Sequence, residues 1–157
     1  MPLAYVGLGD LFVFLFFGLA AVCGTCFVQI HHVPPSAWFA GAAIGLLATA
    51  ILVVNNLRDR ETDALANKRT LAVRFGPRVA RMEHMICILG AYGLIILAVG
   101  VGVGPTSWLL TLLSIPLAAK EIRSVREKDG PDLNAHLAGA ARLELIVGML
   151  LCVGGWL

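Results

Sequence analysis

Long apolar runs separated by short polar connections dominate this chain. Uncharged stretches cover 11–29, 36–57, 85–119 and 145–157, and the third is interrupted by glycines and Pro105. An α-helix needs about 20 apolar residues to cross the hydrocarbon core of a membrane. The pattern therefore predicts an all-α fold, a polytopic transmembrane helix bundle that forms a single membrane domain over 1–157. The expected spans are about 10–29, 37–57, 80–101, 106–122 and 139–157.

Composition agrees with a membrane protein rather than a water-soluble domain. Hydrophobic residues make up 59% of the 157 residues and charged residues only 14%, and the mean hydropathy is +0.85. The first apolar run lies close to Met1 but has no basic residue before it, and it is too long for the apolar part of a secretory signal. We therefore expect it to be a span of the mature protein.

Basic residues are confined to alternate connections. The turns at 31–36 and 102–107 contain no Lys or Arg, whereas seven basic residues separate the second and third spans and five surround the connection between the fourth and fifth. By the positive-inside rule, both charged connections lie in the cytoplasm, and the protein is integral to the inner (plasma) membrane. The net charge of +2 is too small to indicate a nucleic-acid partner.

Polar side chains gather where the second apolar run ends. The segment Asn55-Asn56-Leu57-Arg58-Asp59-Arg60-Glu61-Thr62-Asp63 places two carboxylates four residues apart, and Lys68-Arg69-Thr70 follows. If the helix begun near Trp38 continues, Asn55, Asp59 and Asp63 share one face, with Asn56 one turn before Asp59. Mg²⁺ accepts one or two carboxylates and completes its shell with water and substrate phosphates, which suits a neighbouring Lys-Arg pair.

A solvated surface network, with Asp59 paired to Arg58 or Lys68, is the structural alternative. Three observations favour a ligand site. The asparagines lie on the apolar side of the boundary, where polar groups are costly. Residues 67–70 read as a turn and a helix start, whose N–H groups bind anions. Arg74, Arg78 and Arg81 extend the positive field.

Several segments resemble the UbiA-type intramembrane prenyltransferases. The 55–63 segment, followed by Lys68-Arg69-Thr70-Leu71-Ala72-Val73-Arg74-Phe75-Gly76, is similar to the second aspartate-rich motif of that family, with Asn67 where the family often has Gly. The segment 7–18 resembles the start of a family helix, and 132–134 resembles the start of its last span. The likeness is strongest to the branch that prenylates 1,4-dihydroxy-2-naphthoate in menaquinone biosynthesis.

The resemblance implies transfer of a polyprenyl group from polyprenyl diphosphate to 1,4-dihydroxy-2-naphthoate within the lipid bilayer. It implies Mg²⁺ as cofactor, catalytic roles for Asp59 and Asp63, and metal ligation by these carboxylates and Asn56. Diphosphate binding would fall to the basic side chains of Arg58, Lys68 and Arg69.

The chain also departs from the family, whose members have about nine spans and two facing aspartate motifs. The first motif is absent, since Asp10 is the only acid before Asp59. We therefore expect a C-terminal half that is inactive without an N-terminal half bearing that motif. A non-catalytic membrane remnant is the main alternative, and a cation-binding transporter fragment is a weaker one.

Other polar features have plainer interpretations. Cys23 and Cys26 form a CxxC, but they lie within an apolar run and are expected to pack between helices. Gly41 and Gly45 favour close helix packing or an apolar groove. His84 and His136 are expected at the membrane interface.

Overall fold

The structure, a computed structural model, describes residues 7–157, in which all regular secondary structure is helical and no strand is present. The opening at Met1 and Pro2 lies outside the described residues. The first long helix runs from Gly9 to Ile30 and is built from α1 (Gly9–Val13), a π-helical stretch η2 (Phe14–Ala20) and α2 (Ala21–Ile30). It is followed by α3 (Pro35–Arg58) and by the short helices α4 (Arg60–Leu65) and α5 (Leu71–Phe75).

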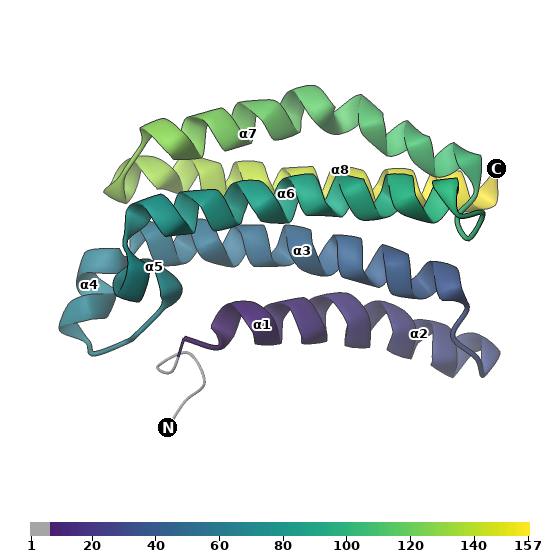
Figure 1. Cartoon of the computed structure of the whole chain (residues 1–157), viewed down its shortest axis with the longest axis horizontal. Coiled ribbons are helices and arrows are strands. Elements are labelled where there is room, and N and C mark those ends of the chain that lie inside the picture. The colour runs from purple at the N-terminus through teal and green to yellow at the C-terminus, as the bar shows by residue number, and fades with distance from the viewer. Residues whose placement is uncertain (1–6) are drawn as a thin grey trace.

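The remaining chain forms three more rods. They are α6 (Pro77–Gly100), a 3₁₀ helix η3 (Thr106–Ser114) that continues into α7 (Ile115–Glu127), and a 3₁₀ turn η4 (Gly130–Leu133) that leads into α8 (Asn134–Trp156). The rods lie roughly antiparallel to their chain neighbours, side by side along one axis (Figure 1). The predicted all-α bundle is confirmed.

Four segments of the described chain are long and apolar enough to cross a membrane as helices: Gly9–Ile30, Pro35–Arg58, Pro77–Gly100 and Gly130–Trp156. They correspond to the first, second, third and fifth predicted spans. The last begins earlier than predicted, because polar residues from Gly130 onward are already helical. The exposed apolar side chains on these helices, such as those of Phe16, Phe17 and Val28, suit contact with lipid.

The predicted span at 106–122 is not a single α-helix. Its first part is 3₁₀, where the hydroxyl of Thr111 donates to the carbonyl of Trp108 and that of Ser114 to the carbonyl of Thr111. Pro116 has no N–H to donate to the carbonyl four residues earlier, so α-helical geometry cannot extend unbroken through this point. The combined rod still extends along the bundle (Figure 1), about 37 Å from the rises of the two helix types.

Helix α3 is the centre of the bundle and packs against η2, α6 and α8. Its buried residues include Leu47 and Val54, which meet the interior faces of the neighbouring helices. Close approach to η2 depends on glycine. A Cβ on Gly18 would lie 2.4 Å from the Cα of Gly45 and 2.5 Å from the carbonyl oxygen of Gly41. The predicted small-residue face on α3 is therefore a packing surface.

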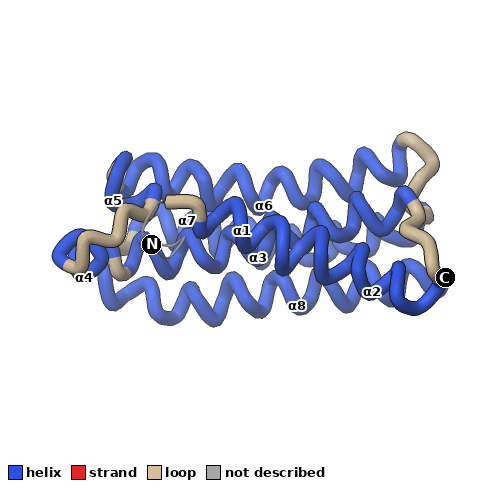
Figure 2. Tube along the Cα trace, turned by 90° about the horizontal axis from the view of Figure 1, so that it is seen from below, coloured by secondary structure: helices blue, strands red, loops and turns tan. Residues whose placement is uncertain are grey.

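Charge is concentrated at one end of this bundle. The end of α3, the starts of α1 and α6, and both short helices lie together, whereas the C-terminus lies at the opposite end (Figure 2). All twelve Lys and Arg residues belong to the connections at that charged end or to the helix segments near it. This arrangement gathers the polar segment 55–70 into one place.

Candidate functional site

The candidate site is built where α3 gives way to α4. Helix α3 ends at Arg58 and does not continue unbroken through the motif as the spacing predicted, because Asp59 leaves the α-helical backbone region, with φ −91° and ψ 8°. The four-residue hydrogen bonds nevertheless persist across the break. The N–H of Asp59 donates to the carbonyl of Asn55 at 3.0 Å, and that of Asp63 to the carbonyl of Asp59 at 2.8 Å.

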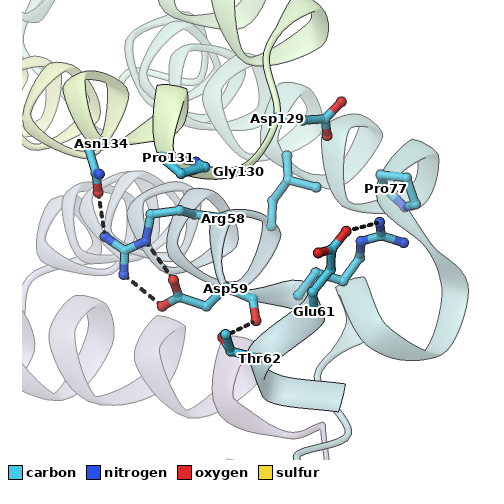
Figure 3. Close-up of a pocket in the computed structure, with 11 residues that line it drawn as sticks. Arg58, Asp59, Glu61, Thr62, Pro77, Asp129, Gly130, Pro131 and Asn134 are labelled. Carbon is cyan, nitrogen blue, oxygen red and sulfur yellow. Dashed lines mark hydrogen bonds and ion pairs between the residues drawn. The ribbon is translucent and has the colours of Figure 1, made fainter. Parts of the chain in front are cut away.

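Asp59 is paired with its chain neighbour Arg58. The guanidinium donates to both carboxylate oxygens, from Nε at 2.7 Å and from Nη2 at 2.6 Å. This hydrogen-bonded cation holds the pKa of the Asp59 carboxyl below its ordinary value, so the side chain is an anion at neutral pH. Arg58 also donates to the side-chain oxygen of Asn55 and to that of Asn134 (Figure 3).

Asp63 is paired with Lys68, whose ammonium nitrogen lies 2.9 Å from the carboxylate oxygen Oδ2. The chain turns back between them at Asn67, which adopts a left-handed conformation with φ 55°. Glycine and asparagine are the residues that tolerate this region best. That explains why the resembling motif often has Gly at this position and why Asn can replace it.

The structure does not bring Arg69 to the two carboxylates. Its side chain is exposed, and within 7–157 no hydrogen bond or ion pair joins it to Asp59 or Asp63. The predicted helix start after it is present, with Thr70 capping α5 by accepting a hydrogen bond from the N–H of Val73 at 3.3 Å. This N–H group is therefore already satisfied by the protein.

Asn56 lies on the buried face of α3 and contacts a residue that sequence reasoning left outside the site. Its amide nitrogen is 3.4 Å from a carboxylate oxygen of Asp10, at the start of the first span. Both side chains are almost fully buried. They line a small cavity of about 60 Å³ together with Lys68 and Thr70. A lone carboxylate inside an apolar run is a signal that could have marked Asp10.

A larger cleft of about 870 Å³ opens beside Arg58 and Asp59. One wall comes from the end of α3 and the start of α4. The other comes from Pro77 and from the segment 129–134, which is far away in the sequence (Figure 3). Its lining combines two guanidinium groups with apolar surface from Leu57 and Pro131 and with three carboxylates, those of Asp59, Glu61 and Asp129. It is large enough for a small anionic group.

Hard oxygen donors of the kind that Mg²⁺ prefers are present, but the set is incomplete. Within the part of the chain that the structure describes, no three His, Cys, Asp or Glu side chains form a group able to hold a metal ion. Asp59 and Asp63 supply two carboxylates on successive turns, and Asn56 supplies an amide oxygen nearby. A Mg²⁺ ion held by these three groups would need its remaining ligands from elsewhere.

Comparison with known proteins identifies a family and several relatives. The model of the UbiA prenyltransferase family matches residues 1–153. The chain is 38% identical over 155 residues to a protein of Haemophilus influenzae named 1,4-dihydroxy-2-naphthoate octaprenyltransferase, covering 98% of this chain and 50% of that protein. A protein of the same name from Escherichia coli is 36% identical, with coverage of 98% and 50%.

A third relative with that name, from Mycobacterium leprae, is 39% identical over 138 residues, which is 87% of this chain and 46% of the relative. The chain thus spans about half the length of the curated relatives it matches. A family match over nearly every residue, together with the apolar helical bundle, establishes that this chain belongs to the UbiA prenyltransferase family.

Proposed function

We propose that this chain forms the diphosphate-binding side of an aromatic prenyltransferase. The reaction is transfer of a polyprenyl group from polyprenyl diphosphate to 1,4-dihydroxy-2-naphthoate, in menaquinone biosynthesis. The observation that carries the proposal is the pairing of Asp59 with Arg58 and of Asp63 with Lys68 at one end of an apolar bundle. The names of the relatives from Haemophilus influenzae and Escherichia coli support the choice of acceptor.

The two carboxylates would hold Mg²⁺, with Asn56 as a further oxygen ligand. When bound, Mg²⁺ neutralises charge on a departing diphosphate. Arg58 and Lys68 would then exchange their carboxylate partners for diphosphate oxygens, which stabilises the same developing charge. Arg69 is exposed beside Lys68 and would extend this positive surface. The polyprenyl tail would lie along the apolar helices, within the bilayer.

The number of metal-ligating oxygens supports the proposal that a second protein segment contributes to the site. Two carboxylates and an amide provide too few ligands and too little negative charge to hold two metal ions against a diphosphate. We therefore propose that a segment with the other aspartate motif of the family completes the site, and that turnover requires it. The confinement of basic residues to one end supports a cytoplasmic site in the plasma membrane.

Binding of the donor tests this function directly. The purified chain in detergent micelles is titrated with a non-hydrolysable polyprenyl diphosphate analogue, with and without Mg²⁺. We expect weak binding that requires Mg²⁺ and is lost in Asp59→Asn, which keeps the shape of the side chain but removes its charge. Glu61→Gln is the matched control. Glu61 is exposed, and its ion pair with Arg60 is long, at 3.9 Å. Equal binding by wild type and Asp59→Asn would refute the assignment.

A further inference from the structure

Arg58 is held from two sides by residues that belong to different parts of the chain. Besides its two bonds to Asp59, it donates from Nη2 to the side-chain oxygen of Asn55 at 2.8 Å and from Nη1 to that of Asn134 at 3.0 Å. Asn55 is one turn away on α3, but Asn134 is the first residue of α8. Figure 3 shows Asn134 beside the guanidinium, at the edge of the large cleft.

The position of Asn134 is fixed by its surroundings. The residue before it, Leu133, is completely buried in the core. The preceding turn is tied to α6 by Arg81, which donates to the carbonyls of Val125 and Lys128 and pairs with Asp129 at 2.7 Å. Asn134 does not cap its own helix, since α8 has no side-chain cap. Its side chain is therefore available to hold Arg58.

Occupation of Asp59 changes the partners of Arg58. A cation bound to both carboxylate oxygens competes with the guanidinium for their lone pairs and their negative charge. When a cation takes Asp59, Arg58 loses its two charged bonds and keeps two neutral acceptors, Asn55 and Asn134. An arginine with no acceptors has many rotamers, and ordering it again costs conformational entropy. Two amide oxygens from separate helices reduce that cost.

We propose that Asn134 is a positioning residue, which holds the Arg58 guanidinium at the cleft so that it binds a diphosphate group once Asp59 is engaged by a cation. This inference rests on the proposed function, because it needs an anionic ligand at the Asp59 and Asp63 site. It also gives Asn134, the first residue of α8, a role in donor binding, although its side chain contributes no ligand to the diphosphate.

The test is titration of the full chain in detergent micelles with inorganic diphosphate in excess Mg²⁺, at concentrations that saturate a weak site. Asn134→Leu, which has similar size and lacks the acceptor, should weaken binding about fivefold to tenfold, the effect of one hydrogen bond. Asn134→Gln retains an amide oxygen and should recover most of the affinity. Asp132→Leu changes the same exposed turn and should not weaken binding.

A double-mutant cycle separates positioning from a general structural effect. If Asn134 acts through Arg58, Asn134→Leu should have no further effect when Arg58 is already Ala. Equal losses in both backgrounds, or wild-type affinity in Asn134→Leu, would overturn the positioning role and leave the proposed function intact. Failure of the wild-type chain to bind diphosphate in Mg²⁺ would instead overturn the proposed function and the inference together.

Discussion

At the scale of single residues, local spacing predicts part of the site. The partners of both carboxylates lie within five positions along the chain, so the sequence alone suggests that Arg58 and Lys68 can reach them. The two other polar contacts join residues 46 and 76 positions apart, between Asn56 and Asp10 and between Arg58 and Asn134. Those contacts depend on how the helices pack, which a single sequence does not reveal.

The buried contact of Asp10 with Asn56 leads to a prediction about ligand affinity. The carboxylate accepts from the amide nitrogen of Asn56, and in the proposed site this would leave the amide oxygen for the metal ion. Asp10→Ala removes the acceptor, so Mg²⁺-dependent binding of the diphosphate analogue should weaken about fivefold. Asp10→Asn retains an acceptor oxygen and should bind more tightly than Asp10→Ala in the same calorimetric titration. Wild-type affinity in Asp10→Ala would exclude this role.

At the scale of elements, the apolar pattern indicates which helices exist but not how closely they approach. The stretch η2 contacts α3 at Gly18 and Gly45, where backbone atoms of the two elements meet. The sequence offered Gly41 and Gly45 as a small face without identifying its partner. Gly18 is the missing half of that contact. Gly18 must lack a side chain because α3 lies against it, and not because of the conformation of its own helix.

This contact predicts a large difference between two similar substitutions. Gly18→Ala would place a Cβ within 2.8 Å of three α3 backbone atoms, which cannot move aside as a side chain would. We expect a loss of about 1–3 kcal/mol in the free energy of unfolding. Gly24→Ala, where nothing lies within 4 Å, should be neutral or slightly stabilising. Unfolding by denaturant in micelles measures both, and equal stability of the two variants would contradict the packing account.

The α7–α8 interface contains polar contacts that the sequence-based interpretation did not predict. His136, expected at the membrane interface, is buried, and its Nδ1 lies 2.8 Å from a carboxylate oxygen of Glu121. Lys128 contacts the other ring nitrogen at 3.1 Å. His84 is also buried, with 1% of its surface exposed. Neither burial follows from the apolar pattern, because burial depends on how the helices pack against one another.

Removing only His136 from its buried pair with Glu121 should lower the free energy of unfolding more than removing both side chains. His136→Leu leaves the Glu121 carboxylate buried without its donor, so the free energy of unfolding should fall by about 3–5 kcal/mol. The double variant Glu121→Leu with His136→Leu removes the stranded charge and should recover much of that loss. Denaturant unfolding of the three proteins provides the measurement. A double variant that is no more stable than His136→Leu would show that the pair is not coupled.

At the scale of the whole molecule, the sequence predicted the bundle because length and hydropathy nearly determine which segments cross a bilayer. It missed the 3₁₀ part of the 106–122 segment, where hydroxyl groups and Pro116 decide the local geometry. Charge asymmetry was also visible in the sequence, and the structure places the basic residues toward one end of the bundle.

That asymmetry predicts which end faces the cytoplasm. In a cysteine-free background, a cysteine at Glu127 should be protected from a membrane-impermeant reagent in intact cells, whereas one at His32 should react. Both positions are exposed, so protection reports on the side of the membrane rather than on burial. The opposite labelling pattern would place the candidate site outside the cell, away from a cytoplasmic supply of prenyl diphosphate.

Prenyl transfer itself tests the central claim most directly. Membranes containing this chain, alone or co-expressed with a segment bearing the first aspartate motif, are supplied with polyprenyl diphosphate, Mg²⁺ and 1,4-dihydroxy-2-naphthoate, and the prenylated quinone precursor is measured. We predict product only in the co-expressed membranes, and none when Asp59 and Asp63 are both changed to Asn. Product from the doubly substituted chain, or no product with any complementing segment, would contradict the account.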